Sequence, residues 1–473
     1  MGILNFILLA FAHYMLGWGI LKAIGIKQIS ASIQYTLVSL LFGLGLSSLL
    51  PVILEMLSIP IHKTSLFIAI VLTTILPAVF WIKEPRQSFS SILKAYSKKF
   101  RLYDLVFIIV LLYLLLPGIL KCVYYPPVPR DLTSGAEAIA EYTLKEQHIN
   151  NSYFSVDLSS TDNYQKPPFL LGLQIIYKMF VQPFGQVWLI LFGCGFFSFL
   201  YVIMRKMVHP VLAGLAAILV LAIPEFYPYT VVLPLYDFPC TVYLLFGFYY
   251  LFLFVKEKDK QNLWLSSVGF GMATLVRPET IFLVLMICIS YYISQVIASR
   301  KLAVKTAFLS CCILMLTALV LDIFTMEIFV KHFIPSSLEF GNKFTSDLSN
   351  LTPLYRRWEF LTEVLMFTKS GAPNNLSQPL YAETFNIMVV FILLELAFVV
   401  ITRKVDFNAA CWFGFMVLVF ILLLLIGYLL PFTEFTNAKR GLFKMIPLIF
   451  VFGVNTRAVQ FISQKIVSWE MKK

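Results

Sequence analysis

The sequence predicts an all-α membrane protein that crosses the bilayer many times. Of its 473 residues, 59% are hydrophobic and 13% are charged, whereas soluble domains average roughly 45–50% and about 25%. Runs such as 103–121 and 410–430 are long enough, as helices, to cross a hydrocarbon core of about 30 Å. An ordinary soluble enzyme is therefore excluded. The net charge of +12 needs no nucleic-acid partner, because membrane proteins retain basic residues on their cytoplasmic side.

Hydropathy predicts about thirteen spans along the chain. The first run has no basic residue before it and no clear cleavage site, so we expect a retained helix rather than a signal peptide. When the spans alternate, the linkers rich in Lys and Arg all fall on one side, which we assign to the cytoplasm. The expected spans are 3–21, 32–57, 64–82, 103–121, 186–204, 211–233, 236–255, 262–276, 279–298, 306–331, 384–402, 410–430 and 441–459.

The opposite face receives two long polar loops, 122–185 and 332–383. This arrangement requires that 167–184 does not cross the membrane. Its polar residues Gln174, Lys178 and Gln182 recur every four positions, a stripe that favours a helix lying at the membrane interface. Segment 132–147 has a second amphipathic helical pattern. The first outer loop therefore offers two juxtamembrane helices.

These features divide the chain into four parts. We expect three transmembrane helices and a basic cytoplasmic loop in 1–102, and a transmembrane core with the first outer loop in 103–331. An outer polar loop follows in 332–383, and further transmembrane helices with a basic cytoplasmic tail occupy 384–473.

Ionisable residues near the outer ends of apolar spans are costly, and a cluster of them indicates a functional site. The first is Asp131, which follows a stiff proline-rich run, 124–130. Such a run could hold a carboxylate at the water boundary as a general base. Asp131 could equally cap the helix expected from Leu132, and the residues alone do not separate these two interpretations.

The other candidates each have a simpler explanation as well. Lys166 precedes two prolines and could be an interfacial lysine. Asp237 opens a span and could be a helix cap, and Arg277 could pair with Glu279. Arg440 lies on a face that the positive-inside tendency disfavours, which an anionic ligand would explain.

The order of these residues resembles the GT-C superfamily of glycosyltransferases, and within it the protein O-mannosyltransferase and aminoarabinose transferase group, which uses dolichyl- or undecaprenyl-phosphate sugars. The matching motifs, over about 103–300, are Asp131 before an A-E-A-I-A-E helix, the K-P-P at Lys166, the D-x-P at Asp237 and the R-P-E turn at Arg277. The first three helices lie outside the resemblance.

The resemblance implies a GT-C-like helical bundle and a site on the periplasmic or outer face of an integral membrane protein, which we expect in a bacterial inner membrane. Its partners would be a polyprenyl-phosphate-linked sugar donor, a lipid, glycan or protein acceptor, and membrane lipids. Asp131 would be the catalytic base of an inverting transfer. The substrate-binding residues would be Lys166, Asp237, Arg277, Glu279 and Arg440.

Two departures from the pattern bear on cofactors. Leu132 stands where the family commonly has a second acid, and Gln165 stands where an acid often precedes K-P-P. A divalent cation prefers several carboxylate oxygens, so we assign no cofactor and no metal ligand, and a divalent metal is the weaker alternative.

Two other classes of membrane protein share this composition. A transporter or lipid flippase usually builds its site at the membrane midplane from repeated halves, which this sequence lacks. A polysaccharide polymerase or ligase would also use outer-face arginines but would not require the K-P-P motif. Clustering of the charged candidates at one face favours the glycosyltransferase.

Overall fold

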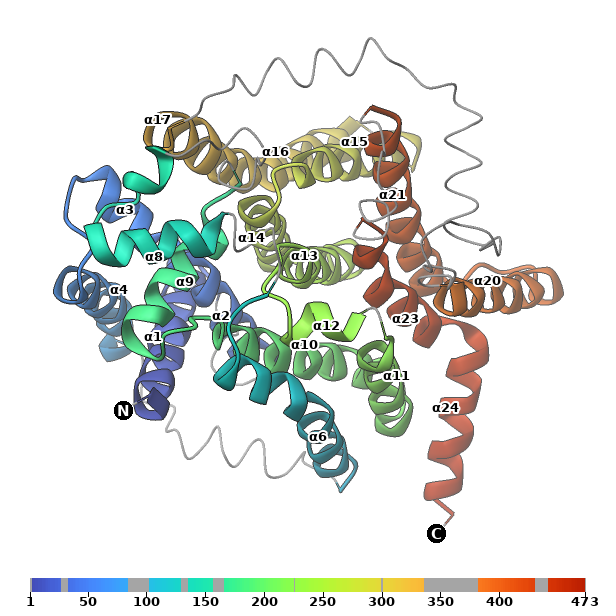
Figure 1. Cartoon of the computed structure of the whole chain (residues 1–473). Coiled ribbons are helices and arrows are strands. Elements are labelled where there is room, and N and C mark those ends of the chain that lie inside the picture. The colour runs from blue at the N-terminus through green and yellow to red at the C-terminus, as the bar shows by residue number, and fades with distance from the viewer. Residues whose placement is uncertain are drawn as a thin grey trace, which may run out of the picture. The chain divides into compact units, whose positions relative to one another are not determined.

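The described part of the protein is helical throughout, and no strand occurs in it (Figure 1). Eight of its helices are long and apolar enough to cross a membrane, or nine if one bent pair counts as a span. This confirms the predicted all-α multi-pass membrane protein. The computed structural model describes residues 2–26, 33–83, 102–128, 135–155, 166–224, 226–298, 301–335, 382–429 and 441–472.

The chain forms two compact units, of which the first carries most of the candidate site. Unit 1 comprises Met1–Val202 and Pro228–Ser337. Its helices are α1 (Gly2–Ala23), α2 (Ile33–Ser47), α3 (Leu50–Met56), α4 (Lys63–Lys83), α6 (Leu102–Tyr124), α8 (Ala136–Glu146), the 3-10 helix η2 (Ser152–Ser155), α9 (Phe169–Phe180), most of α10 (Trp188–Arg205), most of α12 (Phe226–Val231), α13 (Asp237–Glu257), α14 (Lys260–Val276), α15 (Thr280–Ala298), α16 (Lys301–Asp322), the π-helix η4 (Ile323–Val330) and α17 (Lys331–Phe333).

Unit 2 comprises Ile203–Tyr227 and Leu338–Lys473. The helix α23 is buried and packs against α11, α20 and α21. An ion pair of 3.0 Å between Arg457 and Glu395 joins α24 to α20. The helices of this unit are α11 (Pro210–Ala222), α20 (Ala382–Thr402), α21 (Phe407–Leu429), the 3-10 helix η5 (Phe443–Met445), α23 (Ile446–Asn455) and α24 (Arg457–Glu470).

Helices lie in the expected apolar ranges. Range 32–57 holds both α2 and α3 but still counts as one span, whereas two other ranges are broken at an extended residue. Range 211–233 divides into α11 and α12 because Ile223 is extended, the conformation that a residue before proline prefers, and Pro224 follows it. Range 441–459 bends by 58° between α23 and α24, where Thr456 is extended. Hydropathy alone does not reveal such breaks.

The N-terminal helices α1 and α2 cross at glycines. A Cβ atom on Gly43 would lie 1.6 Å from the carbonyl oxygen of His13, and one on Gly17 would lie 1.9 Å from that of Ser39. Only glycine permits so close an approach of the two backbones. The imidazole of His13 lies 2.7 Å from the Ser47 hydroxyl and 3.1 Å from that of Tyr177 in α9, so a buried polar contact joins all three helices.

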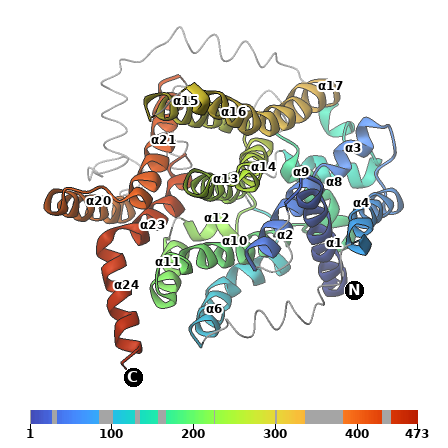
Figure 2. The same cartoon turned by 180° about the vertical axis from the view of Figure 1, so that it is seen from behind.

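The same two helices support the first loop and the core. The carbonyl oxygen of Ser48 would be 1.8 Å from a Cβ on Gly172 of α9. The Tyr243 hydroxyl of α13 donates to the Leu41 carbonyl at 2.7 Å. Figure 2 shows α1, α2 and α4 beside α9, in agreement with their contacts.

Helices α13, α14 and α16 form a tightly packed group. Gly269 of α14 lies against Gly247 of α13, where an added Cβ would approach the Gly247 nitrogen to 2.7 Å. On its other side α14 meets α16, where the hydroxyls of Ser267 and Thr317 lie 2.7 Å apart. This packing fixes the beginning of α13 beside the end of α14.

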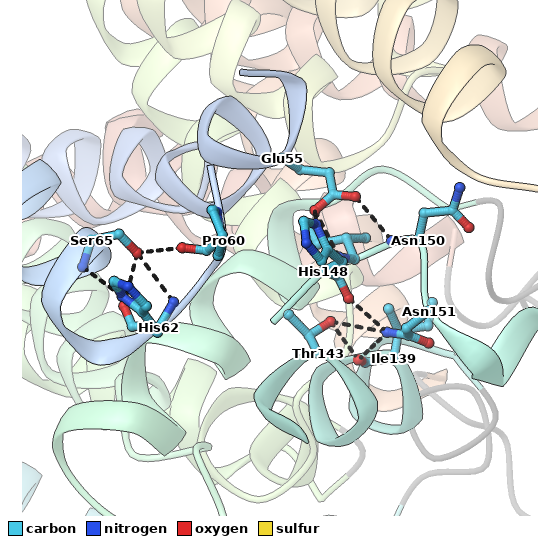
Figure 3. A network of polar contacts seen from close by, with 10 residues as sticks. Glu55, Pro60, His62, Ser65, Ile139, Thr143, His148, Asn150 and Asn151 are labelled. Carbon is cyan, nitrogen blue, oxygen red and sulfur yellow. Dashed lines mark hydrogen bonds and ion pairs between the residues drawn. The ribbon is translucent and has the colours of Figure 1, made fainter. Parts of the chain in front are cut away.

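Loop residues after α8 are held by a buried carboxylate from the N-terminal helices (Figure 3). Glu55 of α3 accepts hydrogen bonds from the backbone N–H groups of Ile149, at 2.8 Å, and Asn150, at 3.2 Å. The Asn151 side chain donates to the carbonyl of His148 at 3.0 Å. The first large loop is therefore fastened to unit 1 rather than being a free appendage.

Candidate functional site

The predicted residues at the ends of α13 and α14 lie together. Asp237 is in the first turn of α13, and Arg277 follows the last turn of α14. An Arg277 guanidinium nitrogen, Nη2, donates to Oδ1 of Asp237 at 2.9 Å, whereas Nη1 lies 3.8 Å from Oε1 of Glu279. Of the two carboxylates, Asp237 from the neighbouring helix is thus the nearer to Arg277, and Glu279 is the more distant.

This ion pair is shielded from water. The Asp237 side chain is 2% exposed, that of Arg277 19% and that of Glu279 32%. Burial lowers the pKa of the Arg277 guanidinium, but the carboxylates of Asp237 and Glu279 outweigh this effect and raise the pKa above its ordinary value. Arg277 is therefore a permanent cation in a partly dehydrated position.

A tyrosine brings Lys166 to the same place. The Lys166 Nζ atom lies 5.7 Å from the centre of the Tyr236 ring, and the Arg277 Cζ atom lies 5.6 Å from it. The buried Tyr236 also donates its hydroxyl to the Pro167 carbonyl at 3.2 Å. Three segments that are distant in sequence thus meet around one aromatic ring.

The K-P-P segment leads directly into α9. Pro168 takes the cap position before Phe169, the first residue of that helix, and the ring of each proline restricts the backbone there. Phe169 is fully buried and packs edge-on against Trp188, Phe192 and Tyr243. This packing fixes the start of α9, and with it the backbone position of Lys166.

Polar residues of α9 face α8 rather than water or lipid. The Lys178 Nζ atom lies 2.5 Å from both Oε1 of Glu137 and Oε1 of Glu141 in α8. Gln174 donates to the second oxygen of Glu137 at 2.6 Å, and Trp188 donates to Gln174 at 3.2 Å. The stripe that suggested an interfacial surface is therefore an interior contact between two loop helices, which we call the α8–α9 clamp.

Burial has the largest effect on the pKa of one carboxyl group in the clamp, that of Glu137. It raises the pKa of Glu137 above the usual 4.5, although Lys178 and Gln174 act in the opposite direction. The side chain of Glu137 is 12% exposed and that of Glu141 is 47% exposed. Lys178 thus places a single positive charge between one mostly covered and one half-exposed carboxyl group.

The last turn of α6 is joined to the end of the same loop. Lys121 donates to the Gln186 side chain at 2.7 Å, and Gln182 donates to the Cys122 carbonyl at 3.2 Å. The Cys122 thiol donates to the Val231 carbonyl at 3.0 Å. The segment leading to 129–134 therefore starts from a fixed point, with Tyr124 and Tyr125 exposed.

Two predicted residues lie outside the described residues. Asp131 falls in 129–134, and Arg440 falls in 430–440. The helices before and after this gap are α6 and α8, both in unit 1. Lys166, Asp237, Arg277 and Glu279 are described and are brought together.

Sequence reasoning missed Tyr236 and the clamp. The signal for Tyr236 was its place directly before Asp237 at the start of a span. For the clamp, the signal was the spacing of Glu137 and Glu141, one turn apart, which matches a cation on a facing helix. Neither pattern alone identifies its partner.

The arrangement can bind an anion. Two cations near one ring, one of them held by a buried carboxylate, are suited to a phosphate group at a partly dehydrated surface. Among the described residues, no group of three or more His, Cys, Asp and Glu side chains could hold a metal ion.

Comparison with known proteins gives one family. Residues 168–322, about a third of the chain, match the model of the dolichyl-phosphate-mannose-protein mannosyltransferases. This range includes α9, α13 and α14, with Asp237 and Arg277. No curated protein and no solved structure gives a significant match. Together with the multi-pass helical architecture, this partial family match supports a membrane glycosyltransferase of the GT-C kind.

Proposed function

We propose that this protein moves a sugar from a polyprenyl-phosphate donor to an acceptor on the non-cytoplasmic face of the membrane, with inversion at the anomeric carbon. The observation that supports it best is the convergence of Lys166 and Arg277 on the Tyr236 ring. The family match supports the reaction class. A lipid, glycan or protein of a cell envelope would be the acceptor, and a bacterial inner membrane its setting.

In the proposed reaction an acceptor hydroxyl oxygen attacks the anomeric carbon. The new glycosidic bond forms as the bond from that carbon to the phosphate oxygen breaks, and its electron pair leaves with the polyprenyl phosphate. Asp131 takes the proton from the acceptor hydroxyl. The products are the glycosylated acceptor and free polyprenyl phosphate.

The leaving phosphate requires cations rather than a general acid, because its negative charge increases as the bond breaks. Lys166 and Arg277 would supply that charge stabilisation, with Arg440 as a further contact. Asp237 would keep Arg277 in place through the 2.9 Å ion pair, and Glu279 would contribute a second, weaker contact to the same guanidinium.

The decisive test is the Asp131→Asn variant, assayed for transfer from a labelled polyprenyl-phosphate sugar. We expect transfer to fall by about a thousandfold, since positioned general bases contribute typically 10²–10⁴-fold, while membrane insertion and binding of sugar-free polyprenyl phosphate are retained. The matched control is Asp406→Asn, because the Asp406 carboxylate caps α21 by accepting from Ala409 N at 3.0 Å.

Near-normal transfer by Asp131→Asn would return Asp131 to a capping role. A second arm uses sealed vesicles containing the protein and labelled donor. Net movement of donor lipid across the vesicles without any new glycosidic bond would instead indicate a transporter or flippase. Growth of a repeating polymer from a diphosphate-linked donor would indicate a polymerase or ligase.

A further inference from the structure

We infer that Tyr236 is a positioning residue for the donor phosphate: its ring holds Lys166 and Arg277 as a two-cation cradle before the donor arrives. This inference rests on the proposed function, because it concerns the same phosphate. It assigns a task to a residue that lies beside the family motif rather than in it. The proposal concerns how strongly the protein binds the phosphate, not proton transfer.

The first argument is geometric. The two cations come from different elements, the K-P-P segment before α9 and the end of α14, and both lie within 5.7 Å of one ring centre. Tyr236 is 3% exposed, so its ring is enclosed by the surrounding protein. The hydroxyl of Tyr236 donates to the Pro167 carbonyl, which joins the ring to the K-P-P backbone as well as to the side chain of Lys166.

The second argument is electrostatic. Two positive groups near one another repel, and the repulsion is stronger where water is partly excluded. The negative face of an aromatic ring attracts each of them, and the carboxylate of Asp237 neutralises Arg277 on another side. The face of the ring can therefore stabilise the two cations near one another.

The third argument concerns unused hydrogen-bonding capacity. The Nε atom of Arg277 is buried, and no residue in the described ranges accepts a hydrogen bond from it. Buried donors are nearly always satisfied, and an unsatisfied one costs free energy. A phosphate oxygen at the cradle would be a suitable acceptor for a guanidinium that already binds Asp237 through Nη2.

These observations distinguish Tyr236 from a tyrosine that only fills space. Tyr243, about two turns further along α13, is also buried, and its hydroxyl donates to the Leu41 carbonyl at 2.7 Å. Its described ring neighbours are Phe42, Phe169, Phe192 and Phe246. It is therefore a matched control with the same hydroxyl-to-carbonyl contact in an aromatic environment.

The experiment measures binding of undecaprenyl phosphate, with neutral undecaprenol as the comparison, to the full-length protein in nanodiscs. Tyr236→Phe is the starting variant, because it keeps the ring and nearly the same volume. Phenylalanines with one, two and three fluorine atoms are then placed at position 236 by nonsense suppression. Fluorine withdraws electron density from the ring face with little change of shape, so it weakens attraction for cations selectively.

We expect Tyr236→Phe to bind undecaprenyl phosphate within about threefold of the wild type, and the dissociation constant to rise stepwise to about tenfold with three fluorines. The dissociation constant should not change along the same series of fluorinated residues at position 243. In transfer assays the Tyr236 series should raise the KM for donor and leave kcat within about twofold, since the ring acts on phosphate binding.

Equal binding across the fluorinated series at position 236, while the wild type still prefers undecaprenyl phosphate to undecaprenol, would overturn this inference and leave the proposed function standing. A stepwise loss at position 243 as large as that at 236 would also overturn it, because the effect would then be general packing. If the wild type does not prefer the phosphate to the alcohol, the proposed donor class itself is wrong, and the inference fails with it.

Discussion

The α8–α9 clamp allows a sharp test of how the first loop is held together. In Lys178→Met the length of the side chain is preserved and its charge is removed. Glu137 and Glu141 then face each other without the cation that lies 2.5 Å from both in the wild type. We expect a marked loss of stability, because two carboxylates that share one buried partner lose it together.

The magnitude follows from burial. Removing one partner of a buried ion pair costs about 3–5 kcal/mol, whereas an exposed pair contributes about 0–1 kcal/mol. Glu141 is half-exposed and can turn to water, and Glu137 can take up a proton, so we expect the lower end, about 3 kcal/mol. The control is Lys331→Met, whose partner Glu327 lies 3.0 Å away in an exposed pair, and it should cost under about 1 kcal/mol.

The pH dependence gives a second measurement. Burial raises the pKa of Glu137 above 4.5. At pH values just above 4.5 this carboxyl therefore keeps its proton in the folded protein but loses it in the unfolded protein. Stability therefore decreases across that window. Loss of Lys178 raises the Glu137 pKa further and widens the window. Lys178→Met should be more destabilised at pH 8 than at pH 5.

The assay is the thermal unfolding of the purified protein in detergent at both pH values, with hydrogen exchange of 136–146 as a local measure. Combining Lys178→Met with Glu137→Gln and Glu141→Gln should recover most of the lost stability, because no uncompensated charge is left. An unfolding midpoint for Lys178→Met equal to that of Lys331→Met at pH 8 would show that the clamp does not stabilise the loop.

Three other predictions address different parts of unit 1. Asp237→Asn should lower kcat/KM for transfer by about ten- to hundredfold, because a hydrogen bond between charged groups is worth about 1.5–3 kcal/mol; unchanged transfer would remove Asp237 from the site. Glu55→Gln should speed hydrogen exchange at the amides of Ile149 and Asn150, which donate to this carboxylate, and equal exchange rates would contradict the contact. Gly43→Ala, whose Cβ would lie 1.6 Å from the His13 carbonyl oxygen, should abolish recovery of folded protein, whereas Gly414→Ala, with nothing within 4 Å, should not; equal yields would show that the α1–α2 crossing tolerates separation.

The helices themselves were largely predictable, because apolar runs of membrane-crossing length leave the backbone few alternatives to a helix. Loop helices α8 and α9 were also anticipated. Breaks were harder to predict: the run 211–233 reads as continuous by hydropathy, although Pro224 is the reason that Ile223 leaves the helix. The partners of Lys178 could not be predicted, because a polar stripe on one helix does not show whether water or a carboxylate of another helix will satisfy it.

For the site, the sequence predicted which residues lie near the same end of the bundle, but not their pairings. Arg277 and Glu279 are two positions apart in the sequence and suggested a local pair, yet Asp237 is closer to the guanidinium, at 2.9 Å against 3.8 Å. That preference arises from the packing of α13 on α14 at Gly247 and Gly269, a long-range property. The contact of Lys166 with Tyr236 likewise depends on how the loop folds back.

The polar contact from His13 to Ser47 and Tyr177 has a consequence for biogenesis. The ribosome releases α1 and α2 well before α9, and early segments of a chain generally fold first. The paired helices α1 and α2 can then form a packing surface before α9 is synthesised, and α9 packs on that surface as it emerges. Deleting them would deprive that helix of its docking surface during synthesis, so a shortened chain should accumulate with its first loop unassembled even where its remaining spans insert correctly.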